Sequence, residues 1–200
     1  MGDWQHYAAQ NPLMLPPRRR VFVSFAQFDR AEVDIFVYRF SVADQVISPC
    51  AVGLAFGDDM INSTDPEYVM NRIRQDYLAD TTVTIVLIGQ CTHSRRFVDW
   101  ELKASLRRGE VYTPNGLLGI LLPSAGAAAH LPERFQVNWQ RGEQNCYARY
   151  RAYPNSGAEL RAWIEDAYSA RTTRAHWISN AAEMMRYNRE CRIHGVTHPA

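Results

Sequence analysis

The regular alternation of short apolar runs with amphipathic stretches constrains the fold of this chain more than any other feature. Four runs rich in β-branched, aromatic and leucine residues have the length of strands: 20–25, 51–56, 83–88 and 116–123. Segments with apolar residues at helical spacing lie between them, and the third of these carries Glu101. Near-continuous apolar strands that alternate with helices are typical of parallel sheets covered on both faces. The sequence therefore predicts an α/β domain, a three-layer sandwich around a mostly parallel central sheet.

Capping signals indicate where helices begin. Asp29 with Glu32, and Ser156 with Glu159, each fit a capping box, in which a short polar side chain and a glutamate three residues later satisfy free backbone N–H groups. The first pair predicts a helix that ends near Gln45, with Val33, Phe36, Val37 and Phe40 facing inward. The second predicts a helix through Ala170. We also expect short strands at 134–138 and 146–153 and a last helix over 176–191. The expected division is an N-terminal arm at 1–19, a domain at 20–150, and a C-terminal helical extension packed on it at 151–200.

Composition excludes several classes of protein. The net charge of +1 gives no electrostatic reason to expect nucleic acid or an anionic membrane as a partner. No apolar run has the length of a membrane span, and the four cysteines form no CxxC pair, which favours reduced thiols and a cytoplasmic location. GxGxxG, Walker A and GxSxG motifs are absent, so a tightly held dinucleotide redox cofactor is not expected. Cys191, His194 and His198 have spacings seen in metal sites, but a single such group near the chain end favours a surface tail, and we predict no metal.

Glu101 has an unusual position on its predicted helix. At about 100° per residue, it falls between an apolar stripe that contains Val98 and a second stripe that contains Phe97. Asp99, Lys103 and Arg107 occupy the opposite arc, which we expect to face solvent. A carboxylate that points inward must find a partner, titrate, or serve a ligand. Either Glu101 is functional, or it is a structural partner of Arg95, Arg96 or Arg108.

The loops that follow the predicted strands carry most of the remaining candidate side chains. The carboxyl ends of parallel strands share one edge of the sheet, so these loops should form one rim, suited to a polar, ribose-like ligand. Each candidate also has a purely structural alternative. The structural alternative for Asp29 is to cap its helix, for Asp58 and Asp59 to form a turn, and for Ser94 to cap the helix of Glu101.

Three segments of the chain resemble the TIR-like domain of bacterial Thoeris anti-phage proteins of the ThsB type. They are RVFVSFAQFD near the start, TTVTIVLIGQCTHSRRFVDWELKASLRRG in the middle, and GLLGILLP after it. The resemblance covers roughly residues 20–123, and it implies a flavodoxin-like fold. It also implies cleavage of NAD⁺ at the nicotinamide–ribose bond, with a cyclic or modified ADP-ribose product that activates a separate effector. NAD⁺ would be the substrate, and no further cofactor is implied.

The resemblance assigns roles by position. Glu101 matches the catalytic glutamate of the family, and Phe97 occupies the aromatic position four residues before it. The remaining residues expected near the nucleotide are Ser24, Phe25, Asp29, Asp59, Thr92, Ser94 and Trp100. The family also implies self-association and an unknown phage trigger.

Two other functions fit the same sequence. One is a TIR-type interaction module without catalysis, in which Glu101 is a buried structural residue. The other is an enzyme similar to nucleoside deoxyribosyltransferases, which have a similar fold and also use a glutamate.

Overall fold

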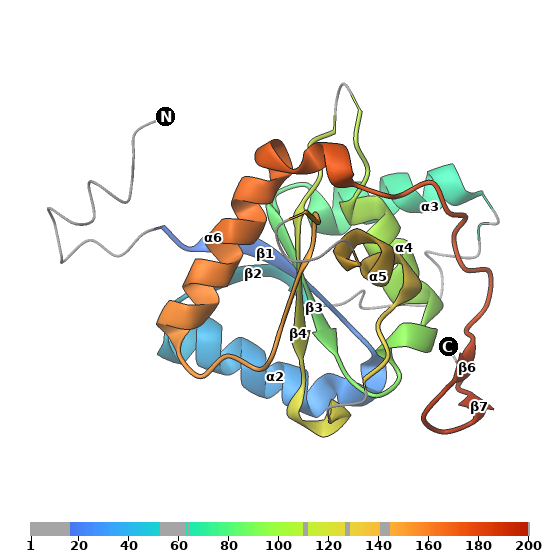
Figure 1. Cartoon of the computed structure of the whole chain (residues 1–200), viewed down its shortest axis with the longest axis horizontal. Helices are drawn as coiled ribbons and strands as arrows, with labels where there is room; N and C mark the ends of the chain where they lie inside the picture. The colour runs from blue at the N-terminus through green and yellow to red at the C-terminus, as the bar shows by residue number, and fades with distance from the viewer. Residues whose placement is uncertain are drawn as a thin grey trace, which may run out of the picture.

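The structure, a computed structural model, describes residues 17–52, 63, 65–109, 112–126, 129–140 and 145–199, with only the backbone of 51 and 52. A five-stranded sheet with the order β2-β1-β3-β4-β5 forms its centre, and every neighbouring pair of strands in it is parallel (Figure 1). The strands are β1 (Arg19–Phe25), β2 (Ile47–Val52), β3 (Val83–Ile88), β4 (Gly116–Leu121) and β5 (Arg149–Arg151). The predicted α/β sandwich is confirmed. β2 begins four residues before the predicted run at 51–56, whose last four residues lie outside the described part of the chain.

Helices cover both faces of the sheet. One face packs against α2 (Arg30–Tyr38) and α6 (Gly157–Thr173), and the other against α3 (Pro66–Ile73), α4 (Arg96–Ser105) and α5 (Glu133–Trp139). Successive strand side chains point to opposite faces, and β1 shows the consequence: Phe25 belongs to the core under α2, whereas Phe22 packs under α3 and α4. This alternation decides which residues of a strand can reach the site.

The first helix follows the sequence pattern but not its predicted cap. α2 continues into a π-helical turn, η2 (Arg39–Ala43), and Val33, Phe36 and Phe40 are fully buried as expected. The Asp29 side chain makes no capping hydrogen bond, so the capping-box prediction for this helix is wrong. In α6 the Ser156 hydroxyl does accept from the Glu159 N–H at 3.2 Å, and that prediction is confirmed.

Two predictions for the C-terminal half are wrong. Residues 134–138 form α5 instead of a strand, since Phe135 and Asn138 are buried at helical spacing and the Asn138 amide bonds back to the Arg134 carbonyl at 2.8 Å. The last helix predicted over 176–191 does not form. After a 3₁₀ turn, η6 (Ala175–Trp177), the chain runs irregularly beside α4 to a short antiparallel pair, β6 (Glu190–Cys191) and β7 (Val196–Thr197). Between the 3₁₀ turn and this pair, backbone carbonyls of residues 180–185 accept from side chains of α4 and α5.

The predicted boundary at residue 150 falls inside the sheet. β5 spans this position, and α6 packs along β4 as part of the outer layer. The short segment beyond α6, residues 174–199, is called the C-terminal tail below. The division into domains itself remains a prediction.

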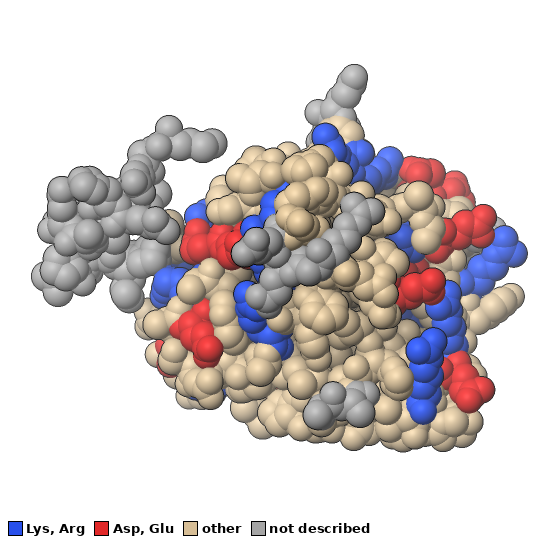
Figure 2. Space-filling model, viewed as in Figure 1, with Lys and Arg blue, Asp and Glu red and all other residues tan. Residues whose placement is uncertain are grey.

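Charges of both signs are mixed over the surface shown in Figure 2, with apolar and neutral residues between them. In the described parts of the chain no helix combines the length and the apolarity that crossing a lipid bilayer requires.

Candidate active site

The candidate site centres on Glu101, which α4 holds against the end of β1. Its side chain is buried, with 2% exposure, so the inward orientation predicted from the helical wheel is confirmed. The Ser24 hydroxyl donates a hydrogen bond to Glu101 Oε2. Ser24 itself is fully buried one residue before the end of β1 and on the face that packs under α4, which is why it reaches the carboxylate. The arrangement joins a carboxylate and a hydroxyl at the carboxyl edge of the parallel sheet, where such folds place ligands.

Aromatic side chains neighbour Glu101 along α4 and in the core under α3 and α4. Phe97 and Trp100 form an edge-to-face pair, with ring centroids 5.5 Å apart and an interplanar angle of 87°. Tyr77 packs against the same small core, and its pKa is raised by burial, by the charge of Asp76 and by that of Glu101. Aromatic rings and a tyrosine in the same region as one buried carboxylate are suited to a ligand that carries both a flat ring and a sugar.

The opposite face of α4 does not face solvent, so that part of the wheel prediction is wrong. Asp99 is 7% exposed, because its carboxylate pairs with the Arg134 guanidinium of α5 at 2.8 Å and accepts from the Met185 N–H at 2.9 Å. Lys103 donates to two backbone carbonyls of the tail. The tail covers this face of α4, which a wheel drawn for one helix cannot show.

The arginines expected as structural partners of Glu101 instead donate to the backbone of the tail. Arg95 donates to the Pro199 carbonyl at 2.8 Å, and Arg108 donates to the Ala175 carbonyl at 3.3 Å. Arg96 donates to the Arg186 carbonyl, and its guanidinium lies 4.6 Å from the centroid of the Phe97 ring. These contacts fix the tail on α4 and leave Ser24 as a direct neighbour of the Glu101 carboxylate.

Asp29 joins two of the strand-end loops. Its carboxylate lies over Gly89, where an added Cβ would come within 2.1 Å of Oδ2, and Thr92 Oγ1 donates to it at 3.4 Å. Burial, followed by the charge of Glu32, raises the pKa of Asp29 to about 6, against the opposing effects of Thr92 and Arg95. The predicted rim of polar side chains is therefore present where the loops after β1 and β3 meet.

The other predicted contacts differ in their surroundings. Thr92 is buried and accepts from the Gly89 N–H at 2.9 Å, and the Ser94 hydroxyl donates to the Cys91 carbonyl at 2.9 Å. Ser94 does not cap α4; the Asn188 side chain of the tail does, by accepting from the Arg96 N–H at 2.9 Å. The structure does not bring Phe25 to Glu101, since Phe25 faces the core under α2. Asp58 and Asp59 lie outside the described residues.

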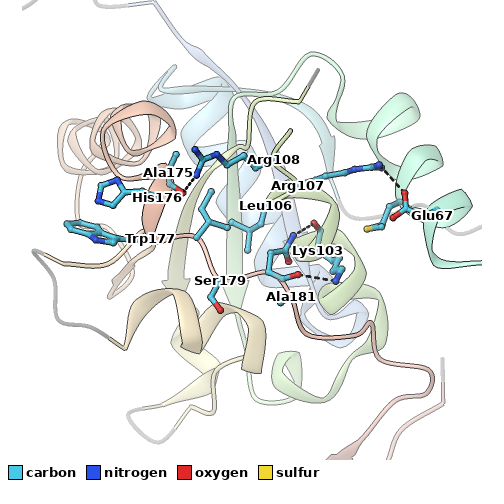
Figure 3. Close-up of a pocket in the computed structure, with 13 residues that line it drawn as sticks. Glu67, Lys103, Leu106, Arg107, Arg108, Ala175, His176, Trp177, Ser179 and Ala181 are labelled. Atoms are coloured by element: carbon cyan, nitrogen blue, oxygen red, sulfur yellow. Dashed lines mark hydrogen bonds and ion pairs between the residues drawn. The ribbon is translucent and has the colours of Figure 1, made fainter. Parts of the chain in front are cut away.

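A pocket of about 570 Å³ lies at the other end of α4 from these loops (Figure 3). Its basic side chains already have partners: Arg107 pairs with Glu67 at 3.0 Å, and Lys103 donates to Asn180 and Ala182. Glu101 and Ser24 do not line this pocket. Its cations therefore connect α4 to α3 and to the tail, and the candidate site stays at the carboxyl edge.

Sequence spacing indicated only part of one arrangement. Cys191 is fully buried, and its sulfur lies 3.2 Å from Cys91 Sγ in the loop between β3 and α4. The interpretation of this part of the chain as a surface tail is therefore wrong for Cys191. The Cys-x₂-His-x₃-His spacing at 191–198 was the available signal, but Cys91 lies one hundred positions away in the chain, and no local pattern connects the two.

The comparison with protein families identifies one match. A model of the family described as Thoeris protein ThsB, TIR-like domain, matches residues 22–127, more than half of the chain. The matched region contains β1, β3, α4 and β4, and with them Ser24, Asp29 and Glu101. A comparison with curated proteins finds no match.

Proposed function

Because the chain belongs to the TIR-like domain family of the Thoeris protein ThsB, an anti-phage defence family, we propose that it cleaves NAD⁺ at the nicotinamide–ribose bond. The observation that carries the proposal is the Glu101 carboxylate, which is buried and bonded to Ser24 at the carboxyl edge of the sheet, on the helix that also carries Phe97 and Trp100. Most helix charges face water and avoid the cost of desolvation, and the other buried carboxylate of α4, Asp99, is neutralised by Arg134.

The chemistry of NAD⁺ cleavage suits a single carboxylate. Nicotinamide leaves as a neutral molecule, so no general acid is needed to expel it. The ribose becomes an oxocarbenium-like cation in the transition state, as in glycoside hydrolysis. An ionised Glu101 would oppose this positive charge and accept hydrogen bonds from the ribose hydroxyls, in a setting from which water is excluded.

The neighbouring residues have separate proposed roles. Ser24 holds Glu101 Oε2 in place, so the carboxylate does not need to reorganise when charge develops on the ribose. Phe97 and Trp100 would contact the flat nicotinamide ring, and Asp29 and Thr92 would contact polar groups where the two loops meet. Asp59 and Ser94 complete the proposed contacts with NAD⁺.

The product would be a cyclic or modified ADP-ribose that signals to a separate effector protein. Ring closure or transfer depends on which nucleophile reaches the exposed ribose carbon before water does. Mass spectrometry of the nucleotide product identifies the new bond. Self-association of the enzyme and activation by a phage component are part of this proposal.

The direct test is nicotinamide release from NAD⁺ by the purified protein, with and without lysate of phage-infected cells. Glu101→Gln keeps the size and the hydrogen-bonding capacity of the side chain but removes its charge, and we expect at least a hundredfold loss of kcat. Glu159→Gln is the matched control, because Glu159 is a half-buried glutamate near the start of α6, on the opposite face of the sheet from α4. Turnover that persists undiminished in Glu101→Gln would refute the role of Glu101.

The burial of Glu101 also favours a second function, a TIR-type interaction module without catalysis. A carboxylate that is 2% exposed and hydrogen-bonded to a serine is equally typical of a residue that only stabilises the fold. In that case Glu101→Gln lowers the free energy of unfolding, while wild-type protein neither binds nor cleaves NAD⁺, even in infected lysate. Isothermal titration calorimetry with NAD⁺ separates the two functions independently of turnover.

A further inference from the structure

Four side chains that bind soft metal ions converge beside the candidate active site. Cys91 lies in the loop between β3 and α4, and Cys191, His194 and His198 lie in the C-terminal tail. Cys91 Sγ is 3.2 Å from Cys191 Sγ, 3.3 Å from His194 Nδ1 and 3.3 Å from His198 Nε2. The two histidine nitrogens are 3.0 Å apart, and all four atoms lie within 4.8 Å of one another. We propose that Cys91, Cys191, His194 and His198 bind one structural zinc ion, which fastens the tail to the loop that precedes α4.

The spacing of the four atoms fits a tetrahedral metal site. Zinc bonds of about 2.3 Å to sulfur and about 2.0–2.1 Å to nitrogen place the ligand atoms of a tetrahedron about 3.4–3.8 Å apart. Four of the six separations, at 3.0–3.3 Å, need only a small expansion to reach these values, and the two from Cys191 Sγ to the histidine nitrogens lie within 4.8 Å. A set of two thiolates and two imidazoles in this geometry favours zinc over magnesium or calcium, which prefer oxygen ligands.

A disulfide between Cys91 and Cys191 explains the arrangement less well. It accounts for the two sulfurs but gives no reason for two histidine nitrogens to lie within 3.3 Å of the same Cys91 sulfur. Binding of one Zn²⁺ would displace the protons of both thiols, and the resulting site would have no net charge. A neutral site can be half-buried at small cost, consistent with Cys91 and Cys191 being buried while His194 is exposed.

Neighbouring groups already orient the ligands. His194 Nε2 lies 3.1 Å from Gln90 Oε1, so this nitrogen carries the proton and Nδ1 keeps the lone pair that faces the sulfurs. Gln90 is held in turn by donation of its amide to the Ser124 carbonyl at 2.9 Å. The ring centroids of His198 and Phe28 lie 4.9 Å apart. A hydrogen bond from the second ring nitrogen, as His194 makes to Gln90, is typical of metal-binding histidines.

The position of the site indicates that the metal is structural. Four protein ligands fill a tetrahedral zinc site and leave no place for substrate. The tail segment next to the ligands supports α4: Asn188 caps the helix, and the Trp100 indole N–H donates to the Met185 carbonyl at 2.7 Å. Zinc at this position would hold these contacts in place and so stabilise the turn of α4 that carries Glu101.

Metal content tests the proposal without any assay of catalysis. Tag-free protein, purified under reducing conditions and dialysed, should contain about one zinc ion per chain by elemental mass spectrometry. After chelation, Co²⁺ should bind and give the intense visible bands of a tetrahedral site, together with thiolate charge-transfer absorption. Protein that contains no zinc and binds neither metal after chelation would overturn the proposal. So would a Cys91–Cys191 disulfide in the protein as isolated from the cytoplasm under thiol-blocking conditions.

Variants then assign the ligands. Cys191→Ser and His198→Ala should each lose most of the bound zinc, whereas the controls Cys50→Ser and His176→Ala, at residues outside the cluster, should retain it. Full zinc content in both ligand variants would contradict the assignment. If a variant fails to fold, hydrogen exchange on the wild-type protein provides the test instead. Removal of zinc by a chelator should accelerate amide exchange in residues 178–199 at least about tenfold and leave the exchange rates of β3 and β4 unchanged. Unchanged exchange in the tail would contradict its proposed attachment by the metal.

Discussion

The Arg134 guanidinium and the Asp99 carboxylate meet at 2.8 Å, with side-chain exposures of only 2% and 10%. This ion pair joins α5 to α4, and the tail closes over it through the Met185 N–H and the Glu183 carbonyl. Removal of one member leaves the other charge buried and unpaired, which is costly inside a protein. We therefore expect Arg134→Met to lower the free energy of unfolding by about 3–5 kcal/mol.

Urea denaturation measures this effect, and Asp34→Asn supplies the control. Asp34 pairs with Arg30 at the same distance, 2.8 Å, but on the exposed surface of α2, with side-chain exposures of 51% and 56%. Loss of that pair should change stability by less than about 0.5 kcal/mol. Equal effects of the two substitutions would show that the tail does not bury the Asp99–Arg134 pair.

Gly89 has no room for a side chain. A Cβ at this position would lie 2.1 Å from Asp29 Oδ2, so Gly89→Ala must displace the Asp29 carboxylate. We expect this substitution to lower the free energy of unfolding by about 1–3 kcal/mol. Asp29→Ala removes the atoms that clash and should rescue much of the loss in the double variant. Gly109→Ala, where the added Cβ would meet the Tyr112 ring at 4.0 Å, should be tolerated. Additive effects at positions 29 and 89 in a denaturation cycle would contradict this contact.

Asp29 should make stability depend on pH between about 4 and 6. Its pKa is raised in the folded protein to about 6, by burial and by the charge of Glu32, so the folded state favours the protonated form. This contribution is fully present below the unfolded pKa and is lost as the pH rises through the folded pKa. The free energy of unfolding of Asp29→Asn should therefore exceed that of wild type by about 1 kcal/mol at pH 7, after allowance for the partial exposure of Asp29 to solvent. At pH 3.5 the two proteins should be equally stable. A difference that does not change with pH would refute the shift.

Ser24→Ala tests whether the bond to Glu101 serves catalysis as well as folding. Loss of a hydrogen bond to a buried carboxylate should cost about 1–3 kcal/mol of stability. In an enzyme that cleaves NAD⁺ it should also lower kcat by about tenfold or more, because Glu101 is then less well positioned. Ser156→Ala, which removes the cap of α6, should cost about 1 kcal/mol without any change in kcat. Equal kcat in the two variants at matched stability would mean that the bond to Glu101 is only structural.

The sequence by itself determined the features that depend on local period. The apolar run Val83–Ile88 identified a buried strand, and the wheel placed Glu101 inward, since both patterns arise from the geometry of one element and its nearest layer. The family resemblance rested on the same segments. The Ser156 cap and the parallel direction of the strands were also predicted from the sequence, whereas the strand order was not.

Tertiary structure alone decided what covers α4 and what meets beside it. The tail covers Asp99 with backbone groups, and the sequence gives no signal for such contacts. Residues predicted to form the last helix therefore hydrogen-bond to side chains of α4 and α5. Cys91 meets Cys191 across one hundred positions, and Ser24 meets Glu101 across seventy-seven. Local periodicity reports which way a side chain points, but the partner that it meets depends on how distant elements pack.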